Sequence, residues 1–161
     1  LLTALDELDQ ADLLEQISHT IDESGMDSRN LRLEITEGLL MEKAGRAAEL
    51  LPALKDMGIK LSMDDFGTGY SSLSYLHNFP LDVLKIDRTF ISRLTEDPRS
   101  ADLVGIILEL AKKFRMQVIA EGVETERQAA RLHALGCSYA QGFHYSEPVP
   151  ADIFERNFLH P

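Results

Sequence analysis

The sequence predicts an α/β fold in which parallel strands are joined by crossover helices. Two observations indicate this fold: short β-prone runs recur along the chain, and longer stretches with helical periodicity separate them. The expected strands cover residues 31–35, 59–63, 83–86, 117–120 and 138–142. Alternation of this kind is typical of parallel sheets, because each return to the same edge of the sheet needs a crossover connection.

Two of the intervening helices carry apolar stripes that are expected to face the sheet. The first stripe consists of Ala47, Leu50, Leu51, Leu54 and Met57. The second stripe consists of Leu103, Ile106, Ile107, Leu110, Ala111 and Phe114. Both repeat every three or four residues, which is the spacing of one face of a helix.

Other signals mark where helices begin and end. Gly58 follows the first stripe at a position suited to a left-handed C-cap, and Gly136 ends a later helix in the same way. Thr125 and Gln128 have the spacing of a capping box at the start of that later helix. Residues 11–24 are expected to form one more helix ahead of the first expected strand.

The chain has 161 residues, of which 44% are apolar, and this suits one globular domain with a core. No apolar run approaches the roughly 18 residues of a membrane-spanning helix, and residues 1–9 lack the pattern of a signal peptide. Cys137 is the only cysteine, which excludes an internal disulfide and a cysteine-rich zinc site. We therefore expect a cytoplasmic protein with no membrane segment.

The net charge of −11 comes from 27 acidic and 16 basic residues. This balance argues against long nucleic acids as partners, because non-specific binding to their backbones needs positive charge. A phosphate-bearing substrate would need help in approaching such a protein. Divalent cations can supply that help, since they reverse the electrostatics of a carboxylate-rich site.

Charged residues cluster at the carboxyl ends of the expected strands. They are Glu34, Asp64, Asp65, Lys85, Asp87 and Glu121. In parallel strands with crossover helices these ends point the same way, so the side chains are expected to converge on one face. Several carboxylates gathered there would repel one another without cations, and oxygen ligands favour Mg²⁺ or Mn²⁺ over zinc. Two such ions are typical of a phosphodiester hydrolase.

Five motifs carry a resemblance to a known family. They are Leu33-Glu34-Ile35-Thr36-Glu37, Asp64-Asp65-Phe66-Gly67-Thr68-Gly69-Tyr70-Ser71-Ser72-Leu73, Leu84-Lys85-Ile86-Asp87, Ala120-Glu121-Gly122-Val123-Glu124-Thr125 and Gln141-Gly142. In order and spacing they resemble the EAL-domain family of cyclic di-GMP phosphodiesterases. The resemblance covers residues 11–150.

The family resemblance implies a TIM-like (β/α)₈ barrel, which needs roughly 250 residues. A chain of 161 residues is therefore expected to be a partial EAL domain over residues 1–161, with strands four to eight of the barrel and their helices. The first three strands, among them the one with the Glu-Ala-Leu signature and the one with an asparagine metal ligand, are expected to be absent. No Glu-Ala-Leu tripeptide occurs in the sequence.

The resemblance also implies roles for individual residues. Glu34, Asp64, Asp65 and Glu121 resemble the family's metal ligands. For Asp64 and Asp65 the alternative is an ordinary turn or N-cap ahead of Gly67.

Lys85, Asp87, Glu121 and Gln141 resemble the family's catalytic group, in which the lysine stabilises charge at the scissile phosphate or orients the attacking water. A lysine at a strand end can also simply extend its charge toward solvent.

Three residues are implied to shape the loop after the second expected strand: Glu37 as its anchor, with Gly67 and Gly69 supplying backbone freedom. A solvated glutamate at a helix start is the alternative for Glu37. Glu124 either supports the site or is likewise a helix-start acid. His144 is the one histidine near this rim and could meet a guanine or a phosphate.

The implied function is hydrolysis of cyclic di-GMP to linear pGpG with two Mg²⁺ or Mn²⁺ ions. Alternatives are an inactive module that binds cyclic di-GMP, a scaffold, and another two-metal barrel phosphodiesterase. Self-association through open sheet edges, as a homodimer for example, is expected of the fragment. An upstream GGDEF or PAS domain is expected in the parent protein.

Overall fold

A computed structural model describes residues 2–4, 8, 12–67 and 73–159. Its strands form one six-stranded sheet in the order β1-β2-β3-β4-β5-β6, and every neighbouring pair is parallel. The strands are β1 Leu2–Ala4, β2 Arg32–Thr36, β3 Lys60–Phe66, β4 Val83–Ile86, β5 Gln117–Ala120 and β6 Tyr139–Ala140. The predicted α/β fold with parallel strands is confirmed.

β1 is an addition to the five strands expected from the sequence. It pairs with β2 through the register Leu2 to Arg32 and Ala4 to Glu34. A run of three residues is too short to show the two-residue period by which strands are recognised. The sheet therefore begins one strand earlier than the sequence indicated.

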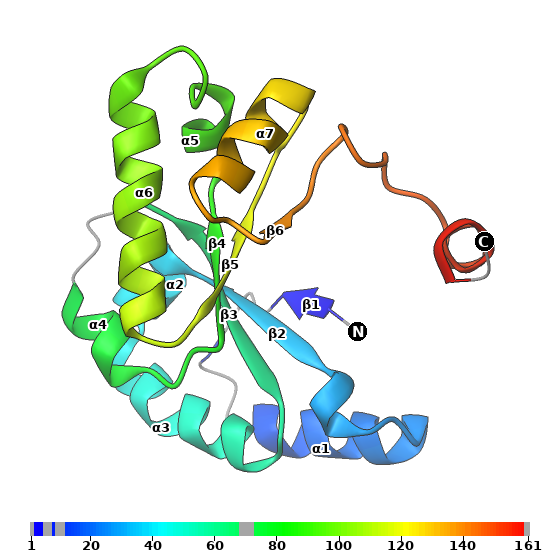
Figure 1. Cartoon of the computed structure of the whole chain (residues 1–161). Coiled ribbons are helices and arrows are strands. Elements are labelled where there is room, and N and C mark those ends of the chain that lie inside the picture. Colours follow the sequence, from blue (N-terminus) through cyan, green and yellow to red (C-terminus); the bar gives the residue numbers. More distant parts are fainter. Residues whose placement is uncertain (1, 5–7, 9–11, 68–72, 160–161) are drawn as a thin grey trace.

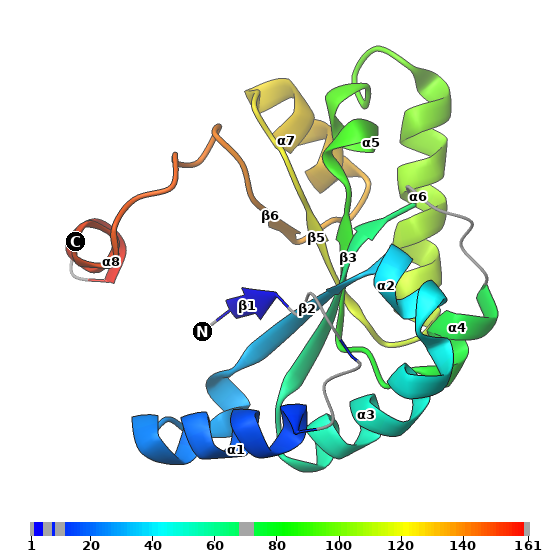
Figure 2. The ribbon, with the colours of Figure 1, turned by 180° about the vertical axis from the view of Figure 1, so that it is seen from behind.

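The helices alternate with the strands along the chain. They are α1 Leu13–Ser24, α2 Glu37–Glu42, α3 Ala44–Asp56, α4 Leu73–Asn78, α5 Arg88–Ser92, α6 Pro98–Lys113, α7 Glu126–Ala134 and α8 Ala151–Phe154, with a 3₁₀ turn at Ser28–Asn30 and a π-helical turn at Glu155–Leu159. Figures 1 and 2 show α3, α4 and α6 along one side of the curved sheet, whereas α8 lies apart from the other helices. No helix in the described ranges has the length and apolar character needed to cross a membrane.

The core lies between the sheet and these helices. One row of core side chains crosses four strands in register: Ile35, Met63, Leu84 and Val118 are all buried. The first predicted stripe faces this row, because Ala47, Leu50, Leu51 and Leu54 are buried on α3 and Met57 packs against the same cluster. Opposite faces of a strand alternate with the residue number. The residues between the core positions therefore face the concave side of the sheet, where the polar groups gather.

The second predicted stripe was partly wrong. Leu103 is 45% exposed and Ile106 is 63% exposed, so both point away from the sheet. The buried positions of α6 are Ser100, Ala101, Val104, Ile107 and Ala111. These positions also follow the helical period, and three of the five have small side chains: Ser100, Ala101 and Ala111. The sequence did not predict this face, because small and polar residues contribute little to an apolar pattern.

The predicted helix ends are confirmed. The Thr125 hydroxyl accepts a hydrogen bond from the Gln128 amide (3.3 Å), and the Gln128 side chain accepts one from the Thr125 amide (3.0 Å). These two bonds form the expected capping box of α7. Gly58 and Gly136 have φ angles of +85° and +88°, the left-handed conformation expected of C-caps.

Candidate metal centre

Charged side chains from neighbouring strands meet around Lys85. Its Nζ lies 2.6 Å from Oε1 of Glu34, 3.1 Å from Oδ2 of Asp64 and 2.6 Å from Oε1 of Glu121. Lys85 is only 4% exposed and lies on β4, at the centre of the convergence. The structure thus brings together residues that are 87 positions apart along the chain, at the carboxyl ends of the strands as the sequence indicated.

Lys85 stays charged in this environment. Burial would lower the pKa of Lys85, but hydrogen bonds to Glu121 and Glu34 outweigh burial and raise that pKa above its ordinary value. Burial also raises the pKa of Glu121, and the contact with Lys85 only partly offsets this. The ammonium group therefore acts as the counter-charge of the carboxylates.

A β-bulge explains how adjacent aspartates can serve one site. The register between β3 and β4 shifts between Met63 and Phe66, and Asp65 has a left-handed φ of +55°. In a regular strand Asp64 and Asp65 would point to opposite faces. The bulge turns both toward the site. As a result, one carboxylate oxygen each from Asp64, Asp65 and Glu121 lie within 4.8 Å of one another.

The electrostatics of this cluster favour a cation. Burial raises the pKa of Asp65, and the negative charges of Asp64 and Asp87 raise it further. Carboxylates held this close repel one another, and a divalent ion would relieve the repulsion. The donor set consists of oxygen atoms, which fits Mg²⁺ or Mn²⁺ better than zinc.

Asp87 has the contacts of a helix cap. Its Oδ1 accepts hydrogen bonds from the amide and the hydroxyl of Thr89, at 2.9 and 2.5 Å, and so caps α5. The ion pairs found for Lys85 within the described residues involve Glu34, Asp64 and Glu121 instead of Asp87. Asp87 influences the site through its charge near Asp65.

Gln141 lies directly beside a candidate ligand. Its Nε2 donates a 2.6 Å hydrogen bond to Oε1 of Glu121. That oxygen is also the one that contacts Lys85. Glu121 is therefore oriented from both sides.

Glu37 holds the residue that follows the bulge. It is the first residue of α2, yet it is only 2% exposed, and its Oε2 accepts a 2.8 Å hydrogen bond from the Gly67 amide. These facts favour the anchoring interpretation over a solvated helix-start acid. Gly67 has a φ of +96°. Gly69, the third residue expected to shape the loop, lies outside the described residues.

Two further candidates lie outside this cluster. The ring of His144 is exposed and makes an edge contact with Tyr145, with centroids 4.9 Å apart. Glu124 is exposed, and its backbone amide donates to Gln128 at 2.8 Å. The structure does not bring either side chain to Lys85.

Ser62 is a polar residue of the site region that was not predicted from the sequence. It is fully buried, and within the described part of the chain its Oγ has no hydrogen-bond partner. It lies in register with Glu34, on the concave face of β3. The available signal was a serine between the apolar residues Leu61 and Met63 of an expected strand.

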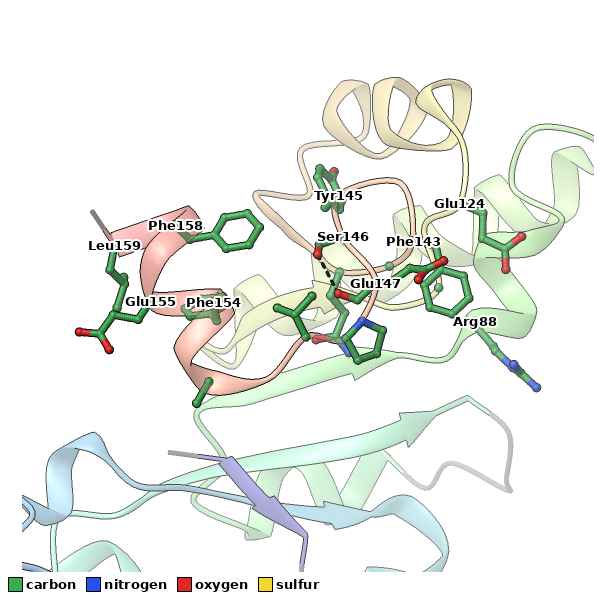
Figure 3. Close-up of a pocket in the computed structure, with 16 residues that line it drawn as sticks. Arg88, Glu124, Phe143, Tyr145, Ser146, Glu147, Phe154, Glu155, Phe158 and Leu159 are labelled. Carbon is green, nitrogen blue, oxygen red and sulfur yellow. Dashed lines mark hydrogen bonds between the residues drawn. The ribbon is translucent and has the colours of Figure 1, made fainter. Parts of the chain in front are cut away.

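A pocket of about 1260 Å³ adjoins the site. Gln141 is among its lining residues. Phe143 lies on one side of the pocket, and Phe154 and Phe158 come from the C-terminal helical segment (Figure 3). Glu124 and Arg88 lie at the end of the pocket nearest α5 (Figure 3). The pocket therefore offers aromatic surface next to the carboxylate cluster.

Comparison with known proteins identifies the family. A sequence model of the EAL domain matches residues 2–148. The chain belongs to the EAL domain family. It is 40% identical over 148 residues to the cyclic di-GMP phosphodiesterase NbdA of Pseudomonas aeruginosa, over 92% of this chain and 19% of NbdA. This EAL chain thus spans about a fifth of the length of that curated relative.

Two solved structures resemble this EAL chain closely. The MucR phosphodiesterase of P. aeruginosa in complex with cyclic di-GMP matches with a TM-score of 0.91 and 38% identity, over 95% of this chain and 63% of that chain. BlrP1 of Klebsiella pneumoniae, in a manganese and cyclic di-GMP complex, matches with a TM-score of 0.82 and 28% identity, over 87% of this chain and 36% of that chain. The sheet is therefore part of the TIM-like EAL fold.

Proposed function

We propose that the domain to which this chain contributes hydrolyses cyclic di-GMP to linear pGpG with two divalent cations, Mg²⁺ or Mn²⁺. The observation that carries the proposal is the convergence of Glu34, Asp64 and Glu121 on Lys85 from separate strands. A structural ion pair needs one partner, whereas here three carboxylates share one ammonium. The cyclic di-GMP complexes of two relatives support the choice of substrate.

In this proposal Glu34, Asp64, Asp65 and Glu121 hold the cations. Asp64 would hold the cations together with Asp65 and Glu121, since one oxygen of each lies in the same group, and its Oδ2 also contacts Lys85. The bound ions would supply Lewis acidity and a nucleophilic hydroxide near neutral pH.

The remaining residues orient these groups. Lys85 places a permanent positive charge where negative charge develops on the phosphate. Gln141 and Lys85 together keep Glu121 in one orientation. Glu37 holds Gly67, and with it the end of the bulge that carries the aspartates.

The proposal is tested with Asp64→Asn in the complete domain. We expect the substitution to lower turnover of cyclic di-GMP in Mg²⁺ by at least about 100-fold, because it removes a negative charge from the residues that would hold the cations, and to affect binding of cyclic di-GMP less. Asp82→Asn is the matched control, because Asp82 pairs with Lys55 at the amino ends of the strands. Near-parental formation of pGpG by Asp64→Asn would contradict the metal assignment.

The same experiment distinguishes the alternative of a module that only binds. A parental domain that binds cyclic di-GMP in calorimetry but forms no pGpG with saturating Mg²⁺ or Mn²⁺ would favour that alternative. A domain that cleaves a different phosphodiester faster would favour another two-metal hydrolase.

A further inference from the structure

The short helix α5 touches the backbone on both sides of the candidate metal centre. A Cβ added to Gly67 would lie 2.7 Å and 2.8 Å from the Cε2 and Cζ atoms of Phe90. A Cβ added to Gly122 would lie 2.5 Å from Cβ of Arg88. Phe90 and Arg88 therefore pack directly on the peptide backbone, at distances that only glycine permits.

Both glycines lie within two residues of candidate metal ligands. Gly67 comes two residues after Asp65, and Gly122 is the residue after Glu121. Each has a left-handed φ, +96° and +67° respectively, so each is a sharp change of chain direction. A shift of either backbone would therefore move the carboxylate that precedes it.

α5 itself is held firmly. Asp87 caps its first turn through Thr89. Ile91 is fully buried, and its carbonyl accepts a 3.2 Å hydrogen bond from Nε2 of Gln128 on α7. A helix fixed by its cap, its core residue and its neighbour is a rigid support.

The cluster needs such a support, because its carboxylates repel one another. Oxygens of Asp65 and Glu121 lie within 4.8 Å in the same group. The hydrogen bond from Gly67 to Glu37 holds the bulge on the side of β2. Phe90 holds the same glycine on the side of β4.

We propose that α5 is a spacer that sets the separation of Asp65 and Glu121, with Phe90 as the positioning residue for Asp65 and Arg88 as its counterpart at Glu121. The inference rests on the metal site of the proposed function. It assigns Phe90 a role in cation affinity, which its half-buried apolar side chain would not suggest. Groups that orient metal ligands typically change metal affinity by about 10- to 100-fold when removed.

The test measures Mn²⁺ binding by calorimetry on the complete domain, together with its melting temperature. We expect Phe90→Ala to weaken Mn²⁺ binding by at least about 10-fold. Phe114→Ala is the matched control: Phe114 is also half-buried against the core, but it precedes β5 and so lies at the opposite end of the strands. We expect the control to lower the melting temperature to a similar extent and to leave the Mn²⁺ affinity within about twofold, because it touches no candidate ligand.

Phe90→Leu keeps part of the contact and serves as the rescue variant. It should bind Mn²⁺ more tightly than Phe90→Ala and more weakly than the parent.

Equal Mn²⁺ affinity of the parent and Phe90→Ala, or equal losses in Phe90→Ala and Phe114→Ala, would overturn the inference while leaving the metal site intact. If Phe90→Ala does not fold, Phe90→Leu decides: a loss of at least threefold supports the spacer role and an unchanged affinity overturns it. A parental complete domain that binds no Mn²⁺ would overturn both the inference and the metal site on which it rests.

Discussion

Nζ of Lys85 lies 2.6 Å from Oε1 of Glu121, and the sheet register explains this contact. Lys85 pairs with Ile119 across β4 and β5, and Glu121 follows two residues later on the same face. The same oxygen of Glu121 accepts a 2.6 Å hydrogen bond from Gln141. The carboxylate is therefore oriented by the protein itself before any cation binds.

Removal of the Lys85 charge should destabilise the metal-free chain. We expect Lys85→Met to lower the free energy of unfolding by about 3 kcal/mol, because it leaves three largely buried carboxylates without a counter-charge. Urea denaturation in the presence of a chelator measures this loss. Saturating Mn²⁺ should recover much of it, since a bound cation takes over the neutralisation.

Lys55→Met is the control for this substitution. Lys55 contacts both carboxylate oxygens of Asp82 at 2.7 Å, but the pair is about one-third exposed. We expect a loss of about 1 kcal/mol or less, as for other partly exposed ion pairs. Equal losses for Lys55→Met and Lys85→Met would show that the buried cluster is no more dependent on its lysine than a surface pair.

In the complete domain, Lys85→Ala should lower kcat much more than it raises KM. A charge directed at the transition state contributes little to binding of the ground state. The expected loss of kcat is about 100-fold or more, the usual scale for removal of such a stabilising group. Steady-state kinetics with cyclic di-GMP measures both constants. Equal changes in kcat and KM would identify Lys85 as a residue that holds substrate.

Glu37→Ala should lower the free energy of unfolding by about 1 to 3 kcal/mol, because it leaves the partly buried Gly67 amide without its acceptor. Glu37→Gln keeps an acceptor oxygen and should lose less. Glu42→Ala, at the exposed end of the same helix, should stay within about 0.5 kcal/mol of the parent. Thermal and urea unfolding of the three variants check the order, and a loss in Glu42→Ala as large as that in Glu37→Ala would contradict the anchoring role.

The sequence predicted the parts of the site that depend on strand order. Glu34, Lys85 and Glu121 were recognisable because each stands at the carboxyl end of an apolar run, and parallel strands bring such ends together. Asp64 and Asp65 also follow an apolar run, and their motif predicted them as metal ligands. The bulge that turns both toward the site depends on a left-handed φ at Asp65, which residue type alone does not reveal.

Features that depend on packing between distant segments could not be predicted. The contacts of Phe90 with Gly67 and of Arg88 with Gly122 join segments that no local pattern connects. The outward orientation of Ile106 has the same origin, because two faces of α6 fit the helical period and only the close approach to the sheet selects one. β1 has three residues and carries no periodic signal.

The last prediction concerns the edges of the sheet: we expect this chain alone to self-associate. β1 and β6 are the outer strands of the sheet, and unpaired strand edges form hydrogen bonds with other chains. A charge on an edge strand opposes such pairing, so Tyr139→Lys on β6 should shift the chain toward monomer. Tyr145→Lys is the matched control, because Tyr145 is 54% exposed against 53% for Tyr139 but lies outside any strand. Light scattering coupled to size-exclusion chromatography, at about 100 µM chain, gives the mass of each species. A parental chain that remains a monomer at that concentration would contradict the prediction, and equal effects of the two lysine variants would place the association elsewhere than at the β6 edge.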